Sequence, residues 1–228
     1  MKHVVKPLSA SIAATVMVAA SFAPVANAEL SANLSVASMY LWRGVDLGDG
    51  SPAVQGGLQY DLDGAYAGVW GSSGDNTLGN EYDLYAGYGG EVGGFRYDLS
   101  LWNYNYSDFT MSGNAAANNN QDDTTGELTE VILGLGYGPV SFQYYDNVAG
   151  ASGYEYYTLS ATYGQFAAKV GFHDAQDGGD MTHLDLTYAY NDNLSFTLSK
   201  VVDQQLDEKD PDAFDEDMKF VVSYSFPL

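Results

Sequence analysis

The chain has 228 residues and a formal net charge of −22 at pH 7, from 30 acidic residues against 8 basic ones. The absence of cysteine excludes disulfide scaffolds, cysteine-ligated metals and thiol nucleophiles, and the negative charge excludes nucleic-acid binding through phosphates. Aromatic residues reach 14%, too many for a disordered chain, and the length permits a single all-β domain.

Residues 1–28 have the features of a secretory signal peptide. Two lysines and a histidine within residues 2–6 form a basic start, residues 11–22 are apolar, and residues 26–28 fit a small-x-small cleavage site. An N-terminal membrane anchor is the alternative, but the apolar run is shorter than the about 20 residues of a spanning helix. We therefore expect a cleaved signal peptide, export from the cytoplasm and a single mature domain over residues 29–228.

After the signal peptide, apolar and polar residues alternate in runs of about ten, which is the pattern of β-strands with two different faces. In one run, Phe95, Tyr97, Leu99 and Leu101 alternate with mostly polar residues. The sequence predicts twelve strands, at 30–43, 52–61, 65–72, 81–90, 95–106, 127–137, 140–146, 154–163, 166–173, 182–190, 194–202 and 218–226.

The connections alternate between long polar loops and tight turns, as in outer-membrane barrels. The expected fold class is all-β, a transmembrane antiparallel up-and-down β-barrel of about 12 strands. A secreted β-sandwich or a lipocalin-like soluble barrel is the alternative, but the polar faces carry too little charge for a solvated exterior. Tyr, Trp and Phe towards the strand ends are typical of aromatic belts at membrane interfaces.

Strand parity places a set of charged side chains on the inward face of the barrel. A lipid-facing Lys or Arg at the bilayer midplane costs about 2–4 kcal/mol, which disfavours the outward face for them. Two interpretations stay open: these charges line a permeation path, or they form ion pairs inside a closed barrel. The predicted pore-lining residues are Arg43, Asp83, Arg96, Asp98, Glu130, Lys169, Asp185 and Lys219.

Two long loops carry further hypotheses. Loop 107–126, rich in Asn, Ala and Asp, either folds into the barrel as a constriction or stays a mobile surface loop. The stretch 203–217 is mostly acidic and lacks EF-hand spacing. It is either a solvated acidic loop or a loose site for divalent cations that bridge to lipopolysaccharide phosphates.

His173 and His183 end one predicted strand and begin the next, so we expect them to face each other at the barrel mouth. A low-affinity transition-metal site is one hypothesis, and ordinary polar residues near water are the other. An enzyme is disfavoured because no G-x-S-x-G motif occurs and no cysteine is present. The sequence predicts no catalytic residue and no cofactor.

Four segments resemble the TorF-type porin family of bacterial outer-membrane proteins. They are Tyr40-Leu41-Trp42-Arg43-Gly44, residues 51–57, residues 64–72 and residues 81–88. The resemblance spans essentially the whole mature chain and is most specific in its first third. It implies an outer-membrane β-barrel with a pore function, and it implies no particular substrate.

Together, the residues and the resemblance predict an outer-membrane porin of a Gram-negative bacterium. It would form a narrow channel for passive diffusion of small hydrophilic solutes or ions. The alternative is a closed barrel that acts as an adhesin or receptor through acidic extracellular loops. The expected partners are outer-membrane lipid and lipopolysaccharide, the barrel assembly machinery, and small solutes or ions, with no nucleic acid.

Overall fold

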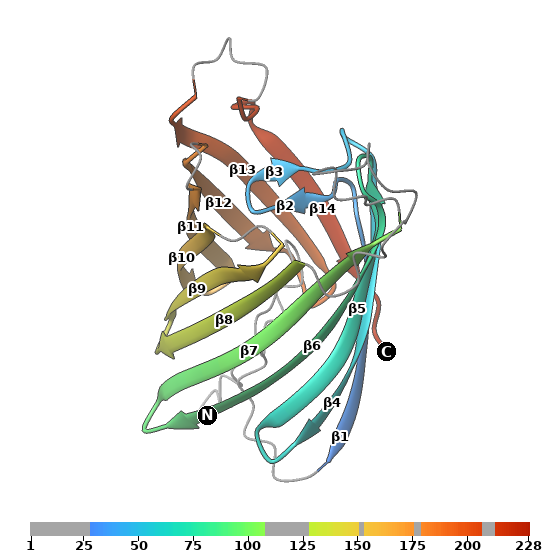
Figure 1. Cartoon of the computed structure of the whole chain (residues 1–228), viewed down its shortest axis with the longest axis vertical. Coiled ribbons are helices and arrows are strands. Elements are labelled where there is room, and N and C mark those ends of the chain that lie inside the picture. The colour runs from blue at the N-terminus through green and yellow to red at the C-terminus, as the bar shows by residue number, and fades with distance from the viewer. Residues whose placement is uncertain (1–27, 108–127, 151–152, 176–178, 207–212) are drawn as a thin grey trace, which may run out of the picture.

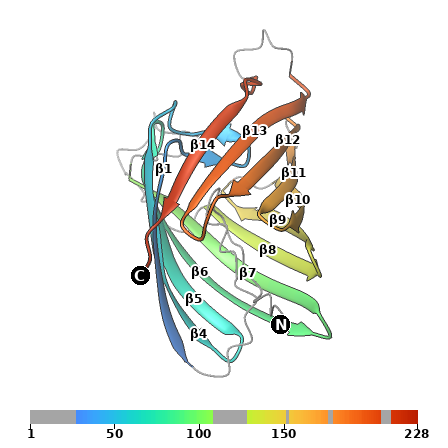
Figure 2. The ribbon, with the colours of Figure 1, turned by 180° about the vertical axis from the view of Figure 1, so that it is seen from behind.

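The structure, a computed structural model, describes residues 28–107, 128–150, 153–175, 179–206 and 213–228. In these ranges the chain forms a closed antiparallel barrel of twelve strands, with a two-stranded hairpin inside it (Figures 1 and 2). The predicted signal peptide and loop 107–126 lie, apart from Ala28 and Ser107, outside the described residues. Within the described ranges, no helix is long and apolar enough to cross a membrane.

The twelve-stranded all-β barrel confirms the predicted fold class. Most predicted strands coincide with observed ones to within a few residues, because the period-two pattern directly marks alternating environments. The barrel strands are β1 (Glu29–Ala37), β4 (Ala53–Leu62), β5 (Ala65–Asp75), β6 (Gly79–Val92), β7 (Phe95–Tyr106), β8 (Leu128–Tyr137), β9 (Val140–Ala149), β10 (Tyr154–Tyr163), β11 (Phe166–Ala175), β12 (Met181–Ala189), β13 (Leu194–Gln204) and β14 (Lys219–Ser225).

The prediction of one long first strand over 30–43 was wrong. Strand β1 ends at Ala37, and the chain then leaves the wall to form the hairpin of β2 (Leu41–Trp42) and β3 (Val45–Asp46). Arg43 and Gly44 form its two-residue turn, with φ of 48° and 85°. Two left-handed residues are what a tight type I′ turn requires. Arg43 therefore lies at the tip of a hairpin and not on the barrel wall.

The barrel is polar inside and apolar outside. On β6, Glu81 and Asp83 are buried in the interior, whereas Tyr82 and Leu84 are exposed on the outer surface. On β12, Asp185 is buried and Leu186 is exposed. This is the reverse of a water-soluble fold, and it makes the outer surface a large exposed apolar surface.

The barrel closes along a short seam between its first and last strands. Strand β1 pairs with β4 at nine positions but with β14 at only three, where residues 35–37 pair with residues 223–225. The backbone N–H of Phe226 extends the seam by donating to the carbonyl oxygen of Leu34 at 2.9 Å. The end of the chain therefore contributes directly to closure.

We expect Phe226→Ser to lower the yield of folded barrel and deletion of Pro227 and Leu228 to be tolerated. The ring of Phe226 packs edge-to-face on Tyr224 with centroids 5.2 Å apart, whereas the last two residues follow the paired segment. The measurement is the fraction of each variant that migrates as a compact, heat-sensitive band on unheated SDS gels. Equal yields for the two variants would show that the Phe226 ring plays no part in closure.

Candidate functional site: a hairpin docked in the lumen

The segment of residues 38–52, here called the inner hairpin, enters the barrel at the end that carries the long loops (Figure 1). Its base is held by polar contacts. The Asp46 carboxylate accepts hydrogen bonds from the backbone N–H groups of Gly48 (3.0 Å) and Gly50 (2.7 Å). The side-chain amide of Asn76 donates to the carbonyl oxygen of Gly48 at 2.8 Å. These contacts fix the hairpin against the β5–β6 turn.

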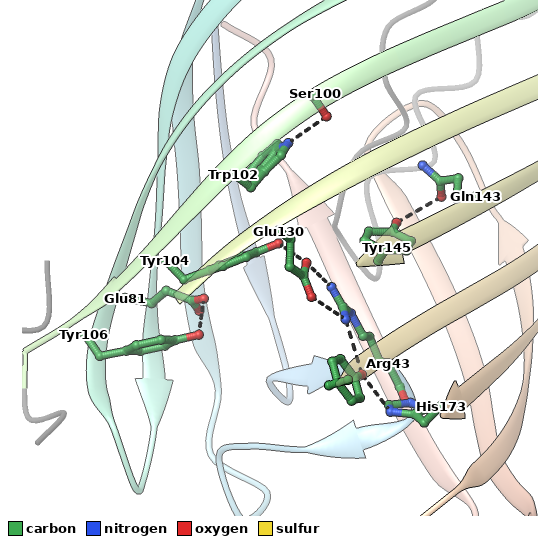
Figure 3. Close-up of polar contacts among 11 residues, drawn as sticks. Arg43, Glu81, Ser100, Trp102, Tyr104, Tyr106, Glu130, Gln143, Tyr145 and His173 are labelled. Atoms are coloured by element: carbon green, nitrogen blue, oxygen red, sulfur yellow. Dashed lines mark hydrogen bonds and ion pairs between the residues drawn. The ribbon is translucent and has the colours of Figure 1, made fainter. Parts of the chain in front are cut away.

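The tip of the inner hairpin forms a buried ion pair with the barrel wall. Arg43 Nη1 lies 2.9 Å from Glu130 Oε1 on β8, and Nη2 lies 2.6 Å from Oε2 (Figure 3). The two side chains are only 5% and 3% exposed. Two parallel N–H···O bonds match the planar guanidinium to the carboxylate, which makes this a strong and directional contact.

Four aromatic rings surround the same guanidinium. Arg43 Cζ lies 4.5 Å from the ring centroid of Tyr145, 4.6 Å from Trp42, 4.7 Å from Tyr156 and 5.6 Å from Tyr154. All four distances are within the range of cation–π attraction, which strengthens when water is excluded. We call the Glu130 carboxylate and the rings of Tyr145, Tyr154 and Tyr156 the wall cage.

A second carboxylate holds the segment that leads into the hairpin. The hydroxyl of Tyr40 donates a hydrogen bond to Glu81 on β6, and Tyr106 donates to the other oxygen of Glu81 at 2.8 Å. Burial and the neighbouring Glu81 carboxylate raise the pKa of Tyr40 far above its usual value, so the phenol remains a donor. Two wall carboxylates, Glu130 and Glu81, thus anchor two groups of the inner hairpin.

His173 on β11 supports the hairpin backbone. Its Nε2 lies 2.8 Å from the carbonyl oxygen of Arg43, and its Nδ1 lies 2.8 Å from the Tyr154 hydroxyl. A carbonyl oxygen can only accept, so Nε2 carries the proton and Nδ1 accepts from the phenol. This assigns one neutral tautomer to His173 while the hairpin is docked.

His183 on β12 lies directly under the turn. A Cβ atom placed on Gly44 would come within 2.6 Å of the His183 ring, so only glycine allows this close approach. His183 Nδ1 lies 3.0 Å from Asp185, and its Nε2 lies 2.7 Å from the hydroxyl of Tyr156. With Asp185 as a carboxylate, Nδ1 donates and Nε2 accepts, which orients the Tyr156 ring of the wall cage.

The two histidines lie close together, with ring centroids 5.9 Å apart, but they are buried beneath the inner hairpin. Their four ring nitrogens all have hydrogen-bond partners. Over the described residues, no group of three or more His, Cys, Asp or Glu side chains is placed to hold a metal ion. The contacts therefore give His173 and His183 a role in supporting the docked hairpin.

The remaining predicted pore-lining residues are distributed over the barrel. Lys169 pairs with Asp185 at 3.8 Å, and Lys219 pairs with Asp215 at 3.3 Å near the long-loop end. Arg96 donates to the carbonyl oxygen of Gly138, in the tight turn between β8 and β9, at 2.9 Å.

Two predicted acids have no basic partner in these contacts. Asp98 accepts from the Tyr66 hydroxyl at 2.9 and 2.8 Å. Asp83 is 0% exposed, and no described side chain donates a hydrogen bond to its carboxylate. The structure thus joins Arg43 to Glu130 and Lys169 to Asp185, and a pore-lining role for the eight residues stays a prediction.

Sequence reasoning missed the tyrosines of the site. Tyr154 and Tyr156 are two residues apart, so they share a face of β10, as do Tyr104 and Tyr106 on β7. The same parity that placed Glu130 inward places these rings inward. The repeated Tyr-x-Tyr pattern beside an inward acid was the available signal.

The protein is a closed antiparallel β-barrel with a polar interior and an apolar exterior, and the inner hairpin lies in its lumen. Residues 21–206 match the family described as "Bacterial protein of unknown function (Gcw_chp)", and the chain belongs to that family. The TorF-type resemblance stays a prediction. The search of curated proteins gave no match. Among solved structures, a mutant of the Rh. blastica porin is similar, with 11% identity and a TM-score of 0.42 over 88% of this chain and 77% of that chain.

Proposed function

We propose that the chain is an outer-membrane channel for small hydrophilic solutes or ions, and that the inner hairpin holds it closed. The observation that carries this proposal is the Arg43–Glu130 ion pair, which joins the tip of the inner hairpin to the wall of a polar lumen. A permanently filled barrel needs no charged contact of this kind, because apolar side chains would fill the same space at lower desolvation cost.

The outer surface supports a membrane location. Exposed apolar side chains cover the outward face of the strands, among them Leu58, Leu84, Leu101, Leu159, Val170, Leu186, Leu198 and Phe220. A closed barrel satisfies the backbone hydrogen bonds of its paired strands internally, as hydrocarbon requires. The tight turns would face the periplasm and the long loops the outside, as in bacterial barrels.

The inward face supports passage of polar solutes. Away from the hairpin, buried inward side chains are largely hydroxyl-bearing or charged, including Ser100, Asp185, Thr187, Thr197 and Ser199. Such groups can hydrogen-bond to water and to hydrophilic solutes once the lumen is hydrated. The lumen chemistry therefore fits small polar solutes and excludes apolar ones.

The experiment compares two proteins in planar bilayers: residues 29–228, and a variant in which a four-residue turn replaces residues 38–52. Ala37 and Ala53 are cross-strand partners in β1 and β4, so a tight turn can join them without moving either strand. We expect rare, small current steps for the parent and large, stable steps for the variant. A folded variant that stays silent would contradict the channel and would favour the adhesin alternative.

We also expect the mature protein to fractionate with outer membranes and to migrate anomalously on unheated SDS gels. Detergent alone rarely unfolds a closed barrel, because the sheet has no long free edge from which to open. The measurement is the mobility shift between unheated and boiled samples of each fraction. Recovery as a soluble periplasmic protein would contradict the membrane location.

A further inference from the structure

We infer that the wall cage is a binding site for a small guanidinium solute, and that Arg43 occupies it as a built-in substitute while the channel is closed. The inference deepens the proposed function, since it names the solute class that the lumen would select. It rests on that function in one respect: a solute reaches the cage only after the inner hairpin has moved.

The site belongs to the wall and would remain after the hairpin leaves. Glu130 lies on β8, Tyr145 on β9, and Tyr154 and Tyr156 on β10. These strands are consecutive neighbours in the barrel, so the cage forms on one continuous patch of sheet. Of the four rings around the guanidinium, only that of Trp42 comes from the hairpin.

The carboxylate of the cage is oriented by another wall residue. Tyr104 on β7 donates a hydrogen bond of 2.7 Å to Glu130 Oε2, one of the two oxygens that bind Arg43. The hydroxyl of Tyr145 donates to Gln143 at 3.1 Å, which positions its ring. These contacts do not involve the hairpin, so they preorganise the site for an incoming ligand.

The histidines orient the remaining rings. Tyr156 is hydrogen-bonded to His183, which Asp185 holds from its other side, and Tyr154 is hydrogen-bonded to His173. Six wall strands, β7 to β12, therefore contribute to one support network. A side chain that only had to close a lumen would not need so many wall groups aligned around it.

The geometry selects a guanidinium among small solutes. Its planar fork meets both oxygens of Glu130 while its faces lie against the tyrosine rings, as the Arg43 contacts show. An ammonium ion presents a point charge and cannot repeat the paired bonds. A neutral solute would leave Glu130 buried and unpaired, which is costly.

The test uses Arg43→Gly, which empties the cage while glycine tolerates the left-handed turn. Methylguanidinium is titrated in two measurements: calorimetry on detergent-solubilised protein, and block of current in planar bilayers. We expect saturable binding and block for Arg43→Gly. In the parent protein, the tethered Arg43 competes at a local concentration of the order of mM, so binding is weaker by about tenfold or more.

Three controls sharpen the result. Urea, a neutral molecule of the same shape, should neither bind nor block at the same concentrations. Tetramethylammonium, a cation without the fork, should bind more weakly than methylguanidinium. Arg43→Gly/Glu130→Gln should lose about tenfold or more in affinity, because a charged hydrogen-bond acceptor is removed. A compact band on unheated SDS gels checks that each variant is folded.

The two proposals fail separately. An Arg43→Gly protein that conducts but does not bind methylguanidinium overturns the guanidinium site and leaves the channel intact. A protein that binds methylguanidinium by calorimetry but never conducts overturns the channel and leaves the site intact. Equal binding of urea and methylguanidinium would also overturn the inference, because charge would then play no part in recognition.

Discussion

Glu130→Gln should shift the barrel from mostly closed to mostly open. Glutamine keeps the size of the side chain but removes the charge that compensates the buried guanidinium of Arg43. Removing one partner of a buried ion pair costs about 3–5 kcal/mol, which corresponds to about two to four orders of magnitude in the docking equilibrium. The measurement is the open probability of single channels in planar bilayers.

Two further variants test the reason for the effect. Arg43→Met/Glu130→Met removes both charges, so it should be more closed than Glu130→Gln, since no charge is left buried alone. Asp98→Asn neutralises a buried lumen acid whose hydrogen bonds go to Tyr66 rather than to the inner hairpin, and it should behave like the parent. If Asp98→Asn opened the barrel as much as Glu130→Gln, the hairpin ion pair would not be the lock.

Val170→Lys should strongly reduce folding into membranes. Val170 is exposed on the outer face of β11, between its cross-strand partners Leu159 and Leu184. A lysine at the midplane of the lipid-facing surface costs about 2–4 kcal/mol. We expect a fall of that size in the free energy of unfolding, measured by denaturant titration in lipid vesicles.

The matched control places the same side chain on the opposite face of the same strand. Ala167 has inward parity on β11, as Lys169 does, and its cross-strand partners are Thr162 and Thr187. Ala167→Lys should therefore cost much less than Val170→Lys. Equal losses would mean that the outer surface does not face hydrocarbon.

The barrel was predictable because its signal is local. A strand with one apolar and one polar face shows a period of two whatever lies far away in the chain, so twelve strands could be counted from sequence. The same property caused the error at 30–43. Alternation continues through Tyr40 and Trp42, and a strand inside the lumen looks like a strand in the wall. The turn at Arg43-Gly44 was the distinguishing signal.

The site was harder to predict because it depends on contacts that are distant in sequence. Arg43 and Glu130 were both placed inward, but they are 87 residues apart, and only the closed barrel brings them together. The aromatic residues were assigned to interfacial belts. Tyr163 at the end of β10 is indeed exposed on the outside, whereas Tyr145 and Tyr156 line the cage. Composition does not separate these two uses of tyrosine, although strand parity does.

The short seam between β1 and β14 has a consequence for the order of folding. Its contacts join residues far apart in the chain, such as Ser38 and Val222, which are separated by 184 positions. Every other pair in the barrel joins strands that follow one another along the chain. Between β1 and β4 the chain forms only the inner hairpin, and each remaining pair is joined by a single loop or turn. Contacts of long sequence separation carry the largest loop-closure entropy and form late. The seam should therefore close last, after the strands that contact the inner hairpin, β6 and β8 to β12, have been assembled.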